Sequence, residues 1–563
     1  MSKVVMQAEQ QLRDALAEAA GKAVAAGELP AEPMPAYAVE IPGDRAHGDL
    51  AANAAMVSAR AFRQPPRKIA EILLQHLDLT GTYLDRAEVA GPGFLNFFLS
   101  PAYYAAVVAD ILTQGDKYGR SDYGQGKRVM VEFVSANPTG PMHMGNARGG
   151  ALGDCLASVL DAAGYKVWRE FYVNDAGNQI EKFGISLEAR YLQLHLGEEA
   201  VEFPEDAYHG DDIKEHAAAF SALYGDKYLH TSSEERRKAL VDYALPLNIE
   251  KMHRDMEKYR IVYDEWFHES TLHQSGQVKE TIQLLTERGL TYEKEGALWY
   301  KASEYGGEKD EVLIRANGHP TYFAADIAYH RNKFGRGFDT CIDVWGADHH
   351  GHVARMKGAM DAVGLKGDNL QVVLIQLVRL MRDGEVVRMS KRSGKAIQLA
   401  DLLDEVPVDA ARFFFNLREA GTRMDFDLDL AIEQSASNPV YYVQYAHARI
   451  CSIFKALAAD GILPRSCTDD ELQLLTEPEE KELIRHLAAY TGEIIAAAKV
   501  YDPARITRYC MELATLFHKF YNACRVKGAE ESLQQARLAL CGATRTTLRN
   551  ALALLKIDAP ETM

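Results

Sequence analysis

The stretch EFVSANPTGPMHMGN, residues 132–146, decides the fold of this chain. It continues from KRVMVEFV (127–134), a β-branched apolar run whose bounding charges predict a buried strand. A helix closed by a glycine is expected over about 146–163, and YKVWREFYV (165–173) predicts the next strand. Strand, helix and strand in such a short segment form a βαβ unit, which predicts a parallel, doubly wound sheet.

The loop between this strand and this helix is a candidate phosphate site. Ligands of open α/β sheets bind at the carboxyl edge of the sheet, with phosphate near a helix N-terminus. His143 could donate a hydrogen bond to an α-phosphate, and Gly145 would let an adenine ring lie flat against the backbone. A plain turn with a surface histidine explains the motif equally well. A P-loop and a G-x-G-x-x-G fingerprint are absent from the sequence, which disfavours kinase-like and dehydrogenase functions.

A second motif, LVRLMRDGEVVRMSKRSGK, occupies residues 377–395. The Asp-Gly pair at 383–384, between two apolar runs, predicts a hairpin with a type I′ turn. The returning strand would deliver Lys391, Arg392 and Lys395, three cations that suit a polyphosphate. A solvated basic loop is the alternative, since basic clusters are common. The position after a series of apolar runs favours the phosphate clamp.

The rest of the chain divides into further units. Length alone predicts three or four domains. Residues 185–300 are charged and mostly helical, and the sheet is expected to resume at 338–347 and 369–381. The expected domains are an N-terminal α+β domain (1–105), a Rossmann-like catalytic domain (126–395) with a helical insertion (about 185–300), a connecting region (396–433) and an all-α domain (434–563).

Composition narrows the classes of protein. The N-terminus is a charged, amphipathic helical pattern rather than a signal peptide, and no run of 18 apolar residues predicts a membrane span. The seven cysteines are scattered and include no C-x-x-C pair, which argues against a structural zinc and against a disulfide framework. Free cysteines of this kind are typical of a protein in the reducing cytoplasm. The net charge of -17 argues against non-specific coating of nucleic acid. It leaves RNA binding open, because local basic surface decides phosphate contact.

The two motifs together resemble the HIGH and KMSKS signatures of class I aminoacyl-tRNA synthetases, as HMGN (143–146) and MSKRS (389–393). Asn146 replaces the final histidine of HIGH and Arg388 the first lysine of KMSKS. Asparagine can still donate to phosphate, and arginine keeps the charge. Other segments are similar to the arginyl-tRNA synthetases: YVNDAGNQI (172–180), PTYFAADIAYH (320–330), VWGADHHGH (344–352), NPVYYVQYAHAR (438–449) and LLKIDAPETM (554–563).

The resemblance implies an enzyme that activates L-arginine with ATP and transfers it to the 3′ end of tRNA(Arg). His143, Asn146 and Lys391 would be its catalytic residues, stabilising the phosphates. Mg²⁺ would accompany ATP, and the enzyme would be a cytoplasmic monomer that generally needs tRNA even for the first step. The N-terminal domain would contact the tRNA elbow, and the all-α domain would bind the anticodon.

The resemblance also assigns binding residues, with no metal site in the protein. Carboxylates in the plane of a guanidinium would bind arginine bidentately, and aromatics with arginine suit unstacked bases. ATP would contact His143, Gly145, Asn146, Asp348, Met389, Ser390, Lys391, Arg392 and Lys395. Arginine would contact Glu132, Ser135, Asn137, His143, Tyr322, Asp326 and Asp348. The tRNA would contact Phe94, Asn96, Tyr442, Tyr445, Arg449 and Met563.

Several alternatives stay open. Asp326 could be a solvated helix residue, and Tyr442 and Tyr445 could pack in a helical core. A small-molecule adenylyl or cytidylyl transferase could use the same first loop, but it would not explain the long helical C-terminal region. A catalytically inactive paralogue that binds RNA is disfavoured by the intact His143, Gly145 and Lys391.

Overall fold

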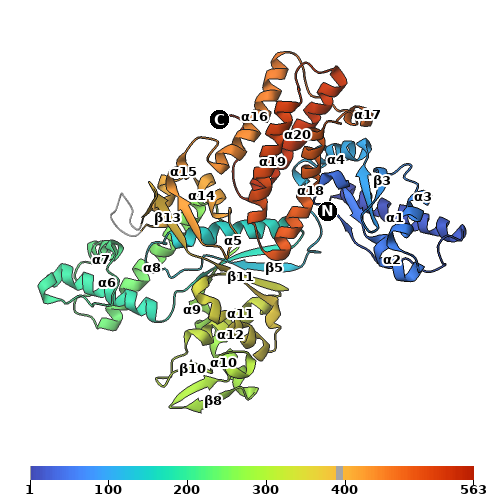
Figure 1. The fold of residues 1–563 in the computed structure, drawn as a ribbon. Helices are drawn as coiled ribbons and strands as arrows, with labels where there is room; N and C mark the ends of the chain where they lie inside the picture. The colour runs from blue at the N-terminus through green and yellow to red at the C-terminus, as the bar shows by residue number, and fades with distance from the viewer. Residues whose placement is uncertain (1, 388–396) are drawn as a thin grey trace.

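The structure is a computed structural model that describes residues 2–387 and 397–563 (Figure 1). Its centre is a five-stranded parallel sheet in the order β12-β11-β5-β6-β7. Counted along the chain this order is 5-4-1-2-3, so the predicted doubly wound sheet is confirmed. The strands are β5 (Arg128–Glu132), β6 (Lys166–Val173), β7 (Glu265–His268), β11 (Thr340–Gly346) and β12 (Leu370–Ile375).

The crossover from β5 to β6 is the predicted helix, α5 (Gly145–Ala162), which is buried along almost its whole length. Gly164 follows it with φ +93°. A Cβ at Gly164 would lie 2.5 Å from the carbonyl oxygen of Ser121, so the turn into β6 requires glycine. The crossover places the start of α5 at the carboxyl edge of the sheet.

Between β6 and β7 the chain forms a helical insert, α6 (Asn178–Leu196), α7 (Asp211–Tyr224) and α8 (Ser233–Lys258), which projects from one side of the sheet domain (Figure 1). The insert has its own small core around Phe183, Tyr191 and Phe220. Ser232 caps α8 by accepting from the Glu235 N–H at 3.2 Å.

The expectation that the sheet resumes only at 338 is wrong, because β7 lies inside the range 185–300 and pairs with β6. Its four residues, EWFH, are too few for an apolar pattern to indicate a strand. Further mixed structure separates β7 from β12: α9 (Glu269–Gln274), α10 (Gln277–Glu287), β8 (Thr291–Lys294), β9 (Ala297–Tyr300), β10 (Glu311–Ile314), α11 (Tyr322–Gly335) and α12 (His350–Ala362). Strands β8 to β10 form a separate antiparallel sheet.

The apolar run 369–381 is two strands rather than one. β12 ends the parallel sheet, and β13 (Val378–Arg382) pairs with β14 (Glu385–Val387) and with β15 (Met424–Asp427) in a small second sheet. Asp383 and Gly384 have φ of 51° and 77°, as the predicted type I′ hairpin turn requires. Strand β15 also interrupts the expected run of helices after 396.

The N-terminal unit is α+β, as the sequence predicts. Its antiparallel sheet has the order β1-β2-β4-β3, and Leu12, Phe62 and Phe97 lie in its core. It lies beside the C-terminal helices (Figure 1). The elements are α1 (Lys3–Ala25), β1 (Val39–Glu40), β2 (Leu50–Ala52), α2 (Ala54–Phe62), α3 (Pro66–His76), β3 (Leu84–Ala90), β4 (Phe94–Leu99) and α4 (Pro101–Gln114).

The C-terminal region packs helices directly on the sheet domain, and one continuous apolar core joins α5 to these helices. Asn438 caps its first long helix by accepting from the Val440 N–H at 3.1 Å, with Pro439 at the first helical position as expected. None of the described helices is long and apolar enough to cross a membrane. The helices are α13 (Leu399–Glu405), α14 (Val408–Phe415), α15 (Leu428–Ile432), α16 (Pro439–Ala459), α17 (Asp469–Leu472), α18 (Pro478–Val500), α19 (Ala504–Ala523) and α20 (Glu531–Leu554).

Candidate active site

The candidate site lies where β5 and β11 run side by side and the chain order of the sheet reverses. Ligands of doubly wound sheets bind at this switch point, beyond the carboxyl ends of the strands. The loop after β5 is held in an uncommon backbone conformation, with φ of 73° at Val134 and 34° at Ser135. Ser135 Oγ donates to Glu132 Oε1 at 2.7 Å and accepts from the Tyr172 N–H at 3.1 Å, which ties the loop to β6.

His143 is exposed at the end of this loop, and Asn146 lies in the first turn of α5. The Nδ1 atom of His143 accepts from the Gly145 N–H at 3.0 Å. Because Nδ1 is the acceptor, the neutral ring carries its proton on Nε2. His143 can therefore donate from Nε2 to a phosphate oxygen beside the helix N-terminus, as its predicted role requires.

The chain that follows the second motif is bonded directly to the first motif. The Met144 N–H donates to the carbonyl of Ile397 at 3.1 Å, and the Leu399 N–H donates to the carbonyl of Met142 at 2.9 Å. His143 and Gln398 form the bridge between these two bonds. The residues of the second motif that are assigned to ATP lie outside the described residues, and their roles stay predictions: Met389, Ser390, Lys391, Arg392 and Lys395.

A cluster of buried charges lies beneath this edge of the sheet. Lys333 of α11 is fully buried and contacts the carboxylates of Glu132 and Asp343, which are opposite each other on β5 and β11. Burial alone would lower the pKa of Lys333, but Asp343 and Glu132 outweigh it and raise that pKa. Burial raises the pKa of Glu132. Both carboxylate oxygens of Glu132 are thus bonded within the protein, to Lys333 and Ser135, and its assignment to arginine stays a prediction.

A cavity of about 590 Å³ opens beyond the ends of β6 and β7, between α9, the start of α6 and the start of α11. Both acids and bases line it: Glu181, Glu269, His273, Arg315 and His319. Tyr322, which is 38% exposed, lines it together with Glu181 and Glu269. A Cβ at Gly177 would lie 3.3 Å from the Tyr322 ring, so the glycine leaves room for this side chain.

Glu269 is a residue that the sequence reasoning missed. Its side chain is only 4% exposed, and His273 Nε2 lies 3.5 Å from its Oε1. Burial raises the pKa of Glu269 to about 7; Asp326 and Asp175 add to the rise, and Tyr172 opposes it. A desolvated carboxyl among other acids is a candidate for binding a cation. The one signal in the sequence was its place directly after β7, a strand that its four residues did not reveal.

Asp326 and Asp348 line a second cavity, of about 460 Å³, and not the cavity that Tyr322 lines. Tyr322 and Asp326 do lie one turn apart on α11, as their spacing predicts. Asp326 Oδ2 lies 3.4 Å from His352 Nε2, and Asp348 is exposed after β11. The remaining arginine candidate, Asn137, is exposed in the first loop.

The predicted tRNA contacts differ in exposure. On α16, Tyr445 is 40% exposed, and the Arg449 guanidinium stacks 4.5 Å from the centre of the Tyr521 ring. Tyr442 is half-buried and its hydroxyl donates to Thr515 Oγ1 at 3.3 Å, so it also packs between helices. Met563 is exposed.

The two candidates of the N-terminal unit lie on β4. Phe94 is half-buried at the start of the strand, whereas Asn96 is buried between β2 and β3. A tRNA contact by Asn96 would require exposure that this fold does not provide, so of the two Phe94 is the better placed. Both assignments stay predictions.

Comparison with known proteins places the chain among synthetases along its whole length. A family model described as "tRNA synthetases class I (R), catalytic domain" matches residues 107–451. The models "DALR anticodon binding domain" and "Arginyl tRNA synthetase N terminal domain" match residues 443–563 and 7–99.

Individual relatives agree with these models. The arginine–tRNA ligase of Ruminiclostridium cellulolyticum is 57% identical over 564 residues, and that of Moorella thermoacetica is 52% identical over 560; each alignment covers 100% of both chains. The structure of the Thermus thermophilus arginyl-tRNA synthetase matches with a TM-score of 0.72 over 98% of this chain and 100% of its own. At 24% identity this last likeness shows the fold alone. The chain belongs to the arginyl-tRNA synthetase family of the class I aminoacyl-tRNA synthetases.

Proposed function

We propose that this chain activates L-arginine with ATP and then charges tRNA(Arg) with it. In the first step a carboxylate oxygen of arginine attacks the α-phosphorus of ATP. The bond from that phosphorus to the bridging oxygen breaks, and pyrophosphate leaves. In the second step a 3′-terminal ribose hydroxyl of the tRNA attacks the carbonyl carbon, forms the ester and releases AMP. Neither step needs a protein nucleophile, so positioning and charge stabilisation decide the rate.

The observation that carries this proposal is the pairing of residues 142–144 with residues 397–399. The two signature motifs are far apart in sequence, yet their flanking backbones are hydrogen-bonded at the switch point of the sheet. His143 Nε2–H and the first turn of α5 face the α-phosphate in this proposal, and Asn146 supports them. Lys391, Arg392 and Lys395 hold the β- and γ-phosphates.

In this proposal the carboxylates near the 590 Å³ cavity select arginine. The guanidinium lies against Glu269 and Tyr322 in the 590 Å³ cavity, with the Asp326 carboxylate close enough to raise the pKa of Glu269. A guanidinium would relieve the repulsion between these two carboxylates and would be bound by charge-assisted hydrogen bonds. Neutral side chains of similar length would leave the acids uncompensated, which gives selectivity.

Mg²⁺ accompanies ATP in this proposal. Among the described residues no group of three or more His, Cys, Asp or Glu side chains is arranged to hold a metal ion. Mg²⁺ bound with nucleotides usually takes its ligands from substrate phosphates and water rather than from an all-protein cage. The ion would supply neutralising charge to the phosphates. We further propose that the chain acts as a monomer in the cytoplasm.

The test is ATP–pyrophosphate exchange with each of the twenty amino acids, run with and without tRNA. Exchange that depends on arginine alone is the expected result. Exchange that depends on another amino acid would mean that the enzyme is specific for that amino acid. If no amino acid supports exchange, with or without tRNA, an RNA-binding paralogue without catalysis is favoured. Labelled arginine transferred to tRNA(Arg), but not to a tRNA of another specificity, completes the assignment.

A further inference from the structure

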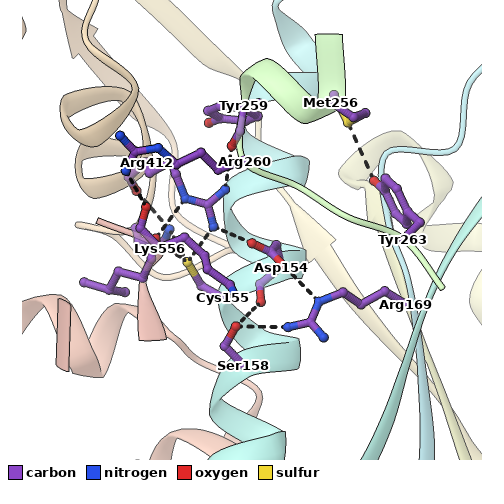
Figure 2. Close-up of polar contacts among 12 residues, drawn as sticks. Asp154, Cys155, Ser158, Arg169, Met256, Tyr259, Arg260, Tyr263, Arg412 and Lys556 are labelled. Carbon is purple, nitrogen blue, oxygen red and sulfur yellow. Dashed lines mark hydrogen bonds and ion pairs between the residues drawn. The ribbon is translucent and has the colours of Figure 1, made fainter. Parts of the chain in front are cut away.

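Arg412 is a fully buried arginine on α14 that joins three distant segments (Figure 2). Its Nη2 donates to Asp154 Oδ2 of α5 at 2.5 Å, and its Nη1 donates to the carbonyl of Tyr259 at 2.9 Å. Its Nε donates to the carbonyl of Leu555, directly after α20, at 2.8 Å. The rigid guanidinium fork serves three acceptors at once, which a lysine ammonium on a flexible stem could not do with the same geometry.

The charge of Arg412 is balanced inside the protein. Burial alone would lower its pKa, but Cys155 and Asp154 outweigh burial and raise it. Asp154 is shared with a second guanidinium, since Arg169 Nε of β6 donates to its Oδ1 at 2.8 Å. Arg169 also donates to Ser158 Oγ at 3.0 Å, one turn along α5 (Figure 2). Removing one partner of such a buried network leaves an uncompensated charge.

Tyr259 extends this network to the signature motif. Its carbonyl accepts from Arg412, and its hydroxyl donates to the carbonyl of Ala147 at 3.0 Å. Ala147 is the residue after Asn146, in the first turn of α5. Two hydrogen bonds through one residue therefore connect Arg412 to the turn that carries the phosphate-binding groups.

On the other side, the network continues into the predicted tRNA-binding helix. After Leu555, the carbonyl of Lys556 accepts from Arg260 Nη1 at 3.1 Å. Further on, the carbonyl of Pro560 is 2.8 Å from Nδ1 of His447 on α16, the helix that presents Tyr445 and Arg449. The segment 555–560 is thus bonded both to α16 and, through Arg412, to α5.

We propose that Arg412 is a positioning residue for the activation step, which couples the C-terminal segment 555–560 to the first turn of α5. Contacts made by the C-terminal helices change the placement of segment 555–560, and Arg412 with Tyr259 passes that change to His143 and Asn146. This inference rests on the proposed function. Misplacement of reacting groups by about 1 Å can cost about a hundredfold in rate, so a small shift of α5 suffices.

The test compares Tyr259→Phe, Arg412→Lys and Arg412→Gln in arginine-dependent exchange at saturating tRNA. Tyr259→Phe removes one hydroxyl and keeps the ring, so it preserves the packing. We expect its kcat to fall about threefold to tenfold, and that of Arg412→Gln about tenfold or more, with the KM for arginine within about twofold of wild type. The double variant Tyr259→Phe/Arg412→Gln should be no slower than Arg412→Gln alone, because both substitutions interrupt the same series of hydrogen bonds.

The matched control is Arg537→Gln, which removes another buried arginine that is bonded within the C-terminal helices, to Glu480 at 2.7 Å and to the Arg525 carbonyl at 2.7 Å. Arg537→Gln should lower the free energy of unfolding and leave kcat and KM for ATP–pyrophosphate exchange unchanged. Amide hydrogen exchange at residues 143–150 should speed up in Tyr259→Phe and Arg412→Gln and not in Arg537→Gln.

Two outcomes overturn the inference. Unchanged kcat in both Tyr259→Phe and Arg412→Lys would reduce Arg412 to a structural role, as would additive losses in the double variant. Failure of the proposed function looks different, because the wild-type protein itself would then show no arginine-dependent exchange.

Discussion

The two ends of the candidate site hold opposite charge by different means. At the proposed phosphate end the described groups are His143 Nε2–H and the N-terminus of α5, and the cations of the second motif are expected to complete them. At the proposed arginine end the carboxylates of Glu181 and Glu269 lie among basic side chains, and Glu269 is desolvated enough that burial raises its pKa to about 7. Donors near solvent suit a hydrated triphosphate, whereas buried acids suit a guanidinium that sheds its water.

The largest effect is expected from breaking the phosphate end at Lys391. Lys391→Ala should lower kcat for exchange by one to two orders of magnitude or more, because it removes a cation that stabilises charge developing on the leaving pyrophosphate. Pre-steady-state adenylate formation measures it. Lys294→Ala, an exposed lysine on β8, is the matched control and should change nothing. Unchanged exchange in Lys391→Ala would remove this residue from the mechanism.

Breaking the arginine end should act on binding rather than on chemistry. Asp326→Ala should raise the KM for arginine by about thirtyfold or more, because truncating one partner of a charged pair costs about 2–5 kcal/mol. The KM for ATP should stay within about twofold. Steady-state kinetics in both substrates check this, with Asp326→Asn separating charge from shape. Equal rises in both constants would mean that the arginine pocket is misplaced.

The pH dependence sharpens the contrast between the two ends. Because the pKa of Glu269 is about 7, its ionised fraction rises from about a tenth at pH 6 to about nine tenths at pH 8. The KM for arginine should therefore fall about tenfold over this range, while the KM for ATP should show no matching slope. Asp175, His273 and Asp326 lie close to Glu269, and Glu181, Arg315 and His319 line the same cavity.

Glu269→Gln is the control for this pH dependence, since it removes the titrating group and should flatten the arginine slope. If the slope persists in Glu269→Gln, another group titrates. His273, whose pKa is lowered by burial, is then the next residue to substitute in the search for the titrating group.

The smallest effect is on stability. The pKa of Glu269 is raised on folding, so its stabilising contribution is fully present below about pH 4.5 and is lost as the pH rises through about 7. At pH 8 the wild type carries a buried charge that Glu269→Gln lacks. The variant should be more stable there by about 1–3 kcal/mol, with little difference near pH 4. Urea unfolding without substrate at both pH values measures this, and equal stability at pH 8 would contradict the buried charge.

Much of the fold could be predicted from local patterns. The run 127–134 and the glycine at 164 defined β5, α5 and the turn into β6, because burial and backbone conformation there depend on nearby residues. The Asp383-Gly384 turn could be predicted because a type I′ turn needs positive φ at both central residues, which the Asp-Gly pair favours. Strand β7 and the division of 369–381 into β12 and β13 could not be predicted, since four-residue strands and the choice between two sheets depend on which partners are present.

The sequence by itself determined the family, because motif residues can be recognised without knowing where the fold places them. Only the tertiary structure decided that residues 397–399 pair with 142–144, that Glu269 joins Tyr322 in one cavity, and that Arg412 connects α5 to the C-terminal segment. These are contacts between residues more than fifty positions apart. Burial, and with it the pKa of Glu269 and the balance of charge around Arg412, exists only once those distant segments exclude water.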